Sequence, residues 1–408
     1  MIAQEEQFRI YLHAPLKAEA PLKAEAPLTV RQLKLSALDA FSRTDNTLAT
    51  LIRNFNEALH PEGKAFGFRN DDVFIVYSPK INENQIKALL IKTGLYFSAD
   101  SKIENPEALQ RTFVLPAEKD ALNYEVSRIE STMPSRSDAA SEKSAAHKRF
   151  VLPPVAAEQG KKQLTPAELA RISKALVNTD FSNMIRRQFV CIVLDDIAPS
   201  PMFEEVFVSI ADLGETILPD VSLTATPWLF QDLTETLDKC VLTTVSRHDD
   251  GAFYRDFSLN LNVSSILSED FKSFDKGIRE NMKASVVLEL QPIDIVSDFS
   301  MYVRARDFAQ SLGYKICIDG VSALNLPFID REKLGADFVK LTWQADLPDL
   351  LTQDEKLKEK ILSIGSNRTI LCRVDDEKAL NFAKESKITL LQGRYIQHLL
   401  STAPRRPA

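Results

Sequence analysis

The chain has 408 residues, a formal net charge of −7, an apolar fraction of 44% and a charged fraction of 26%. This length and composition are typical of a globular protein with two or three domains. An acidic chain lacks the basic surface of general nucleic-acid or anionic-membrane binders, so we expect no nucleic-acid partner.

The first part of the chain, residues 1–116, is predicted to form a small α/β domain. Residues 14–28 repeat the hexamer APLKAE, a pattern typical of a loop insertion. Residues 44–59 place their large apolar side chains on one helical face, which predicts an amphipathic helix. The other expected elements are a strand within 30–41, a β-hairpin with its turn at 69–71, and a helix at 84–93.

The composition changes at 117–163 to Ala, Ser, Lys, Glu and Arg, with few large apolar residues. Such a segment cannot bury much apolar surface, which predicts a flexible linker, helical in part at its start. Ordered structure resumes at Thr165, since Thr165, Pro166 and Glu168 match a capping box at a helix start.

Residues 164–402 alternate between apolar runs and helical patterns. The apolar runs fall at 189–194, 205–210, 257–263, 286–290, 315–319, 337–342, 368–374 and 387–392. The helical patterns fall at 226–246, 264–281, 298–312, 354–364 and 375–385. Parallel strands joined by crossover helices predict an α/β fold of the (β/α)8 TIM-barrel type. The alternative is an open doubly wound sheet, but no Gly-rich phosphate loop follows any strand. Residues 403–408 are expected to be a disordered tail.

Polar residues stand near the predicted carboxyl ends of six of these strands, where barrel enzymes gather their chemistry. They are Glu205, Asn262, Glu289, Asp319, Lys340 and Gln392. Carboxylate and amide oxygens at one barrel mouth suit Mg²⁺, Mn²⁺ or Ca²⁺, and a lysine there could orient water or balance a phosphate. Any one of these residues alone could equally be a helix cap or a solvated loop residue.

In order and spacing these residues resemble the motifs of EAL domains, barrel phosphodiesterases of the bacterial messenger cyclic di-GMP. The resemblance covers about residues 164–400. The Glu-Ala-Leu signature is similar to Glu205-Val206-Phe207, and the Asn-Leu-Ser strand to Asn262-Val263-Ser264. The remaining matches are Glu289 in the Glu-Ile-Thr-Glu segment, Asp319 as the first Asp of Asp-Asp-Phe-Gly, Lys340 in Leu-Lys-Ile-Asp, and Gln392-Gly393 for Gln-Gly.

The chain departs from the family where catalysis is concentrated. The departures are Gly320 for the second metal-binding Asp, Pro292 for the second Glu, Thr342 for an Asp, Cys372 for the general base and Ser209 for the nucleotide-gripping Arg. Two-metal hydrolysis needs carboxylates that bridge both ions and a base for the water. The resemblance therefore implies no catalytic residue, no cyclic di-GMP hydrolysis and no resident cofactor. At most one Mg²⁺ or Mn²⁺ ion is expected, at Glu205, Asn262, Glu289 and Asp319.

The first domain is weakly similar to GGDEF diguanylate cyclases, with Asp71 and Asp72 at the acidic positions of their hairpin. Arg69 and Asn70 replace the glycines that let a nucleotide approach, and Ala37 replaces the first metal-binding Asp. An unrelated α/β module with an acidic turn is the alternative. With either origin, we expect no cyclase activity.

These observations predict a catalytically inactive, EAL-like bacterial signalling protein that acts as a scaffold or regulator through protein partners. The alternative is a non-hydrolysing cyclic di-GMP receptor with weak binding. A third hypothesis is phosphate-ester chemistry at Glu289, Asp319 and Lys340. The chain has no run of eighteen apolar residues and its four cysteines form no CxxC pair. We therefore expect a cytoplasmic protein without membrane insertion.

Overall fold

The computed structural model describes residues 4–13, 27–38, 45–97, 109–131, 162–177, 184–217, 219–223, 225–247 and 256–402. The tail at 403–408, nearly all of the expected loop insertion and most of the expected linker lie outside these described residues. The chain divides into two compact units, Met1–Lys143 with Leu194–Ile197 and Ser144–Val193 with Ala198–Ala408, and each is described by itself.

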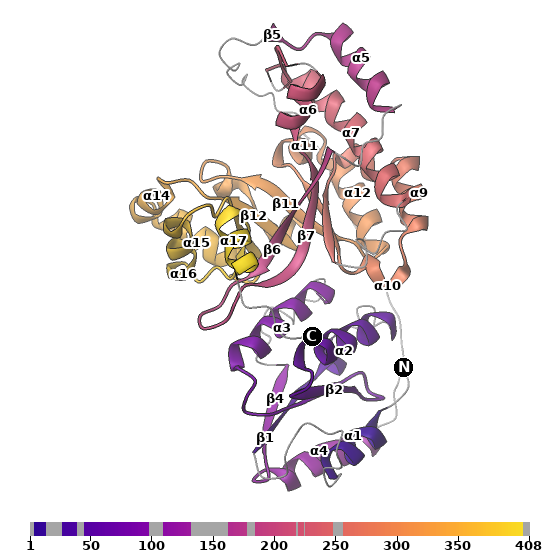
Figure 1. Cartoon of the computed structure of the whole chain (residues 1–408), viewed down its shortest axis with the longest axis vertical. Helices are drawn as coiled ribbons and strands as arrows, with labels where there is room; N and C mark the ends of the chain where they lie inside the picture. The colour runs from indigo at the N-terminus through magenta and orange to yellow at the C-terminus, as the bar shows by residue number, and fades with distance from the viewer. Residues whose placement is uncertain are drawn as a thin grey trace. The chain divides into compact units, whose positions relative to one another are not determined.

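The first unit is built on a four-stranded antiparallel sheet in the order β2-β3-β1-β4 (Figure 1). Its strands are β1 (Leu28–Leu33), β2 (Gly63–Gly67), β3 (Val73–Tyr77) and β4 (Gln110–Leu115). The predicted hairpin is confirmed, because β2 and β3 pair across the 69–71 turn. The strand predicted within 30–41 begins earlier, at Leu28, and gives way to a 3-10 turn at Leu35–Ala37.

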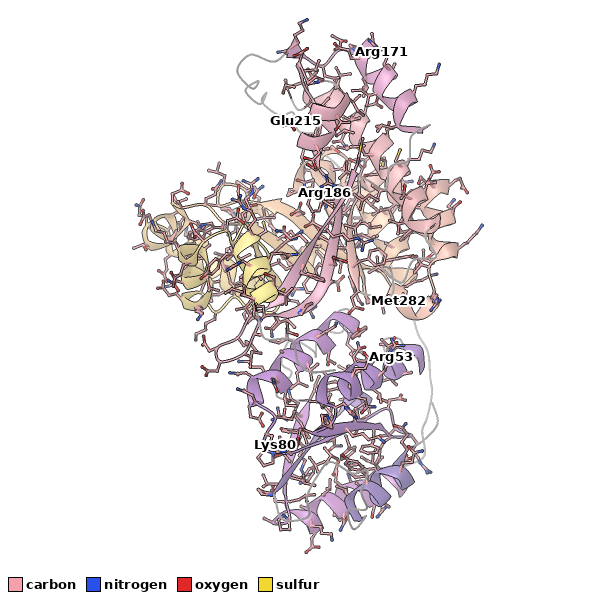
Figure 2. All side chains as sticks on the ribbon, viewed as in Figure 1. Arg53, Lys80, Arg171, Arg186, Glu215 and Met282 are labelled. Atoms are coloured by element: carbon pink, nitrogen blue, oxygen red, sulfur yellow. The ribbon has the colours of Figure 1, made fainter. Side chains whose placement is uncertain are left out.

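Helices cover both faces of this sheet, with α2 (Asp45–Leu59) and α3 (Glu83–Tyr96) on one face and α1 (Glu5–His13) and α4 (Lys119–Ser131) on the other (Figure 1). The helices predicted at 44–59 and 84–93 are confirmed. Helix α2 follows its sequence pattern, since its apolar stripe is buried. Arg53, on another face of α2, has an exposed side chain (Figure 2).

Helix α4 lies at the start of the expected linker, where partial helix was predicted, but it belongs to the first unit. Its residues Leu122, Val126 and Ile129 are buried in the same core as Phe8 of α1. Their spacing of four and three residues is a helical stripe, short enough to be hidden in a polar stretch. Residues 119–131 therefore belong to the first unit, and a domain boundary at 116 is too early.

The second unit contains a closed eight-stranded barrel in the order β10-β11-β12-β13-β14-β6-β7-β9, as predicted. The strands are β6 (Ile185–Ile192), β7 (Ser200–Val208), β9 (Phe257–Asn260), β10 (Val286–Leu290), β11 (Lys315–Val321), β12 (Phe338–Thr342), β13 (Thr369–Cys372) and β14 (Leu390–Leu391). One strand departs from the all-parallel arrangement, because β6 is antiparallel to both β7 and β14. The connection from β6 to β7 is too short for a crossover helix and forms a hairpin instead.

Helix α5 precedes the barrel strands, α6 to α16 lie between them along the chain, and α17 follows the last strand. They are α5 (Pro166–Val177), α6 (Ile210–Ile217), α7 (Pro227–Arg247), α8 (Val263–Ile266), α9 (Glu269–Gly277), α10 (Glu280–Lys283), α11 (Pro292–Ser297), α12 (Phe299–Ser311), α13 (Arg331–Leu334), α14 (Leu347–Gln353), α15 (Glu355–Ile364), α16 (Glu377–Glu385) and α17 (Arg394–Thr402). Two short strands, β5 (Lys162–Gln163) and β8 (Val221–Ser222), pair outside the barrel.

The helix-start signal predicted at Thr165 is confirmed in this unit. The capping box at the start of α5 is formed, since the backbone N–H of Thr165 donates to Glu168 (2.9 Å) and that of Glu168 to Thr165 Oγ1 (3.3 Å). The helix predicted at 264–281 is instead divided into three short helices, with Ser268 capping the second. Within the described part of the chain, no helix is both long and apolar enough to cross a bilayer.

Candidate functional site in the barrel mouth

A buried lysine occupies the centre of the barrel. Alternation along β12 turns Val339 and Leu341 to one side of the sheet and Lys340 to the other. Lys340 Nζ donates to Glu205 Oε2 (2.7 Å) and to Glu289 Oε2 (2.6 Å). A buried ammonium group needs such partners, because removal from water is costly unless the charge is paired. The two carboxyl groups therefore hold Lys340 between β7 and β10.

Glu205 is also fixed by two amides. Its Oε1 accepts from Asn260 Nδ2 (2.7 Å), and its Oε2 accepts from Gln392 Nε2 (2.6 Å). Burial alone would raise the pKa of Glu205, but the charge of Lys340 and these hydrogen bonds hold it below its ordinary value. Glu205 is therefore the ionised partner of Lys340 at neutral pH.

Glu289 behaves differently. Burial, reinforced by the charge of Glu205, raises the pKa of Glu289 to about 8, although Lys340 opposes this. Burial would also lower the pKa of Lys340, but Glu289 and Glu205 raise it well above its ordinary value. Within the described part of the molecule, Glu289 Oε1 has no hydrogen-bond partner. One cation therefore faces one ionised carboxylate and one carboxyl group that keeps its proton near neutral pH.

Asp319 lies on β11, within a bulge between Ile318 and Val321. Its Oδ2 accepts from Gln291 Nε2 (2.9 Å), and burial raises its pKa. The bulge contains Gly320, whose φ of +70° favours glycine. A Cβ at Gly320 would lie 2.5 Å from Gln291 Oε1. An amide therefore occupies the space where a side chain at position 320 would begin.

Asn262, expected at this site, lies elsewhere. Its Oδ1 accepts from Gln231 Nε2 (2.6 Å), and both its Nδ2 and its backbone N–H donate to Asp238 Oδ2 (2.8 and 2.7 Å). Strand β9 ends at Asn260, and Asn262 follows as the residue before α8. The side chain of Asn262 therefore ties this connection to α7 rather than contacting Glu205.

Asn260 takes the expected place beside Glu205, so the prediction of Asn262 was wrong by two residues. A shift of two preserves the strand alternation, which is why the pattern alone could not distinguish the two asparagines. A signal was present, because Asn260-Leu261 matches the Asn-Leu of the resembled motif better than Asn262-Val263. Gln291 was missed because it follows β10 with no motif of its own.

The cysteine at the position of the family's general base lies at the end of a strand. Cys372 ends β13, and its Sγ lies 3.6 Å from Thr342 Oγ1. Burial raises the pKa of Cys372 to about 11, so its thiol keeps its proton at neutral pH. Cys317 on β11 is fully buried, and burial raises its pKa well above the ordinary value. Both thiols therefore stay protonated at neutral pH.

The structure thus brings together Glu205, Glu289, Asp319, Lys340 and Gln392. Among the residues that the structure describes, no three Asp, Glu, His or Cys side chains converge as ligands for a metal ion. Glu205 accepts on both oxygens, and Glu289 presents Oε2 to Lys340. Lys340 already contacts Glu205 Oε2 and Glu289 Oε2, and Asn262 lies away from these carboxyl groups, so the set expected to hold a single divalent ion is not assembled as predicted.

In the first unit, the acidic residue Asp72 beside the hairpin turn is also bound by groups of its own domain. Asp71 has a φ of +70°, the conformation that the missing glycines would favour. Asp72 is buried, and its oxygens accept from Gln32 Nε2 (2.9 Å) and from the backbone N–H of Ser36 (3.0 Å). Asp72 is therefore part of the domain interior and does not face an open nucleotide site.

Comparison with known proteins gives a likeness of shape alone. No protein-family model matches the chain, and no curated protein matches it. Among solved structures, Vibrio cholerae LapD S helix-GGDEF-EAL bound to c-di-GMP shares 14% identity at a TM-score of 0.39. That match covers 96% of this chain and 92% of LapD.

Two further similar structures are EAL-domain proteins. The FimX EAL domain of Pseudomonas aeruginosa bound to c-di-GMP has 17% identity and a TM-score of 0.39, covering 56% of this chain and 95% of that one. Bacillus subtilis YkuI, in complex with substrate c-di-GMP and calcium, has 15% identity and a TM-score of 0.38, covering 56% of each chain. The expected resemblance to EAL domains is thus found, but at these scores it assigns no activity.

Proposed function

We propose that this protein is a non-hydrolysing, EAL-like signalling protein of the bacterial cytoplasm that acts through protein contacts. The observation that supports this proposal is the position of Lys340, whose Nζ lies 2.7 Å from Glu205 Oε2 and 2.6 Å from Glu289 Oε2. The carboxyl groups of Glu205 and Glu289 at the barrel mouth bind an internal cation, an arrangement that differs from carboxylates bridging two metal ions.

The remaining parts of a hydrolytic site are lacking at the positions where the family has them. Gly320 supplies no second carboxylate, and Gln291 binds Asp319 instead. Cys372 at the base position keeps its proton, because burial raises its pKa to about 11. A water molecule at this mouth would have neither a pair of bridging ligands nor an acceptor for its proton.

A hydrolysis assay tests this proposal. The purified full-length chain is incubated with cyclic di-GMP and Mg²⁺ or Mn²⁺, beside a metal-free control and an active EAL domain. We expect no linear dinucleotide above the metal-free control. Metal-dependent linearisation that disappears in Glu205→Gln would overturn the proposal.

A cyclic di-GMP receptor is the second candidate. This candidate is favoured by four polar residues that remain at one barrel mouth, namely Glu205, Asn260, Asp319 and Gln392. It is disfavoured by Ser209, which replaces the nucleotide-gripping Arg of the family. Calorimetry with the dinucleotide, with and without Mg²⁺, separates the candidates. Binding at tens of micromolar that is weakened by Gln392→Ala supports the receptor, and no heat supports the scaffold.

Phosphate-ester chemistry at Glu289, Asp319 and Lys340 is the third hypothesis. It is disfavoured because both carboxyl contacts of Lys340 hold its ammonium group inside the barrel. A phosphatase and phosphodiesterase substrate screen of the purified protein tests it. Turnover lost in Lys340→Met, with the barrel still folded, would support an enzyme in place of a scaffold.

A further inference from the structure

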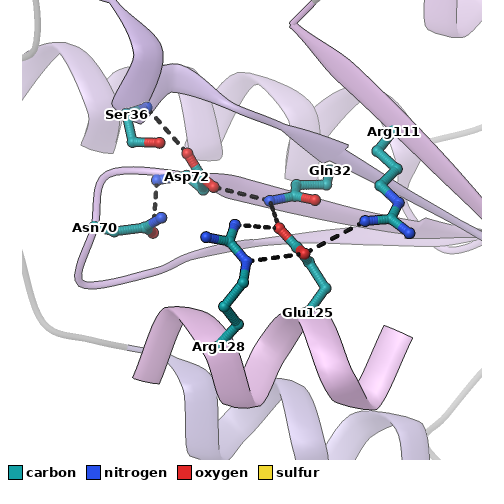
Figure 3. Close-up of polar contacts among 7 residues, drawn as sticks. All are labelled: Gln32, Ser36, Asn70, Asp72, Arg111, Glu125 and Arg128. Carbon is teal, nitrogen blue, oxygen red and sulfur yellow. Dashed lines mark hydrogen bonds and ion pairs between the residues drawn. The ribbon is translucent and has the colours of Figure 1, made fainter. Parts of the chain in front are cut away.

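One buried amide in the first unit bridges two buried carboxylates (Figure 3). Gln32, on β1, donates from Nε2 to Asp72 Oδ2 (2.9 Å) and to Glu125 Oε1 (3.2 Å). Asp72 follows the hairpin turn, and Glu125 belongs to α4. Gln32 Oε1 has no hydrogen-bond partner among the described residues. The side-chain amide of Gln32 therefore links the hairpin to α4.

The hairpin end of this bridge is anchored in several ways. Asp72 Oδ1 accepts the backbone N–H of Ser36 (3.0 Å), which lies in the turn after β1. The backbone N–H of Asp72 donates to Asn70 Oδ1 (3.2 Å) (Figure 3). Asp72 therefore stays fixed to β1 and the hairpin whether or not Glu125 is present.

The helix end depends on solvent-facing countercharges. Glu125 accepts from Arg128 Nη2 (2.6 Å) and Nε (3.2 Å) and from Arg111 Nη1 (3.4 Å) (Figure 3). The hydrogen bond from Arg128 is the main cause of a lowered pKa at Glu125, although burial opposes it. The Arg111 and Arg128 side chains are 46% and 53% exposed, whereas that of Glu125 is 4% exposed. The buried charge is thus neutralised by groups that remain open to solvent.

Apolar contacts hold α4 along a narrow stripe. Leu122, Val126 and Ile129 are its buried residues in the core of this face, and Ala121 packs against that core. A helix of 13 residues is marginal by itself, so its order depends on these contacts and on the Glu125 bridge. Elements with few buried apolar contacts are the ones that open locally before the whole domain unfolds.

We propose that α4 is a detachable helix and that Gln32, Asp72 and Glu125 form its latch. The latch is closed while Arg111 and Arg128 neutralise Glu125. It opens when the two guanidinium groups no longer contact Glu125, because a buried carboxylate without its cations is costly. The sheet, with Asp72 still bound to Gln32, remains folded. In the sequence, residues 132–161 follow α4 and lead to the barrel unit. When α4 detaches, its residues therefore lengthen the segment that joins the two units. This inference does not depend on whether the barrel binds a nucleotide.

Hydrogen exchange on the unmodified full-length protein is the first test. We expect the α4 amides to exchange at least about tenfold faster than the amides of β1 and β3, through an opening that leaves the sheet protected. Equal protection of α4 and of the two strands would overturn the proposal, because the helix would then open only with the whole unit.

A matched pair of variants is the second test. Glu125→Gln removes the latch charge, and Asp120→Asn makes the same charge change at an exposed position of α4. We expect Glu125→Gln to speed exchange in α4 about tenfold more than Asp120→Asn, with β1 and β3 unchanged. Unchanged α4 exchange, or an equal loss in α4 and the strands, would refute the latch. If Glu125→Gln does not fold, the comparison within the unmodified protein still decides.

Discussion

Replacing Lys340 by Met is the most direct perturbation of the barrel mouth. Met has a similar length and no charge, so the space is kept while the ammonium group is lost. Lys340 Nζ makes both of its carboxylate contacts at 2.7 Å or less, and Glu205 and Glu289 stay behind in the interior. Breaking a buried ion pair by removing one partner costs about 3–5 kcal/mol.

The cost should depend on pH in a defined direction. Without Lys340, the pKa of Glu289 in the folded barrel rises further above its unfolded value, and Glu205 loses the main charge that holds its pKa below the ordinary value. A group whose pKa is raised in the folded state contributes most to folding stability at low pH. That contribution is lost as the pH rises through the folded pKa. The deficit of Lys340→Met should therefore be largest at pH 8 and smaller at pH 5.5, where the two carboxyl groups accept protons.

Urea unfolding followed by tryptophan fluorescence measures this deficit. Both tryptophans of the sequence, Trp228 and Trp343, belong to the barrel unit, so the signal reports that unit. We expect the urea midpoint at pH 8 to fall by on the order of 1–2 M. Lys333→Met is the matched control, since its pair with Asp330 is at the surface and such pairs contribute about 0–1 kcal/mol. A deficit below about 1 kcal/mol, or the same deficit at both pH values, would refute the reasoning.

Three further substitutions test single features of the barrel. Gly393→Ala places a Cβ 2.2 Å from the carbonyl oxygen of Val374, so the urea midpoint should fall sharply, and an unchanged midpoint would contradict this close contact. Arg373→Gly relieves a φ of +60° and should stabilise the barrel by up to about 1 kcal/mol in thermal or urea unfolding; a loss of stability would count against strain at this residue. Burial raises the pKa of Asp238 to about 7, so this residue should cost stability as the pH rises from about 4 to 7. Urea midpoints of Asp238→Asn and the unmodified chain at pH 5 and 8 should therefore show a smaller decline in the variant, and parallel declines would refute the assignment.

The barrel could be predicted because its signal is carried by uniform apolar runs. Strands such as 286–290 and 338–342 are buried on both sides, and the sequence between them is long enough for a helix. The antiparallel β6 could not be read in the same way, because strand direction depends on whether the following connection is a hairpin or a crossover. The short interval before β7 was the available sign.

Within the site, the carboxylates and Lys340 were predictable because each interrupts an apolar strand at an inward position. Asn262 was misassigned since strand alternation repeats every two residues and places Asn260 and Asn262 in equivalent phase. Gln291 could not be found from the sequence, because its role depends on the bulge at Gly320 that brings its amide to Asp319. The helical start of the expected linker was predicted, but its place in the first unit was not, as Gln32 and Glu125 become a pair only after the sheet has formed.

The arrangement around Lys340 bears on ion binding even if the pocket can still take a ligand. A divalent ion that bound Glu205 Oε2 and Glu289 Oε2 would have to displace Nζ, because the ammonium group lies at hydrogen-bond distance from both of these oxygens. Displacement moves a buried cation whose pKa is raised well above its ordinary value by those same carboxyl groups. Ion binding at these two oxygens competes with the Lys340 contacts, so Mg²⁺ or Mn²⁺ should bind Lys340→Met more tightly than the unmodified chain in calorimetry. Equal affinity in the two proteins, with Lys340→Met folded, would show that an ion can bind at this mouth without displacing the lysine.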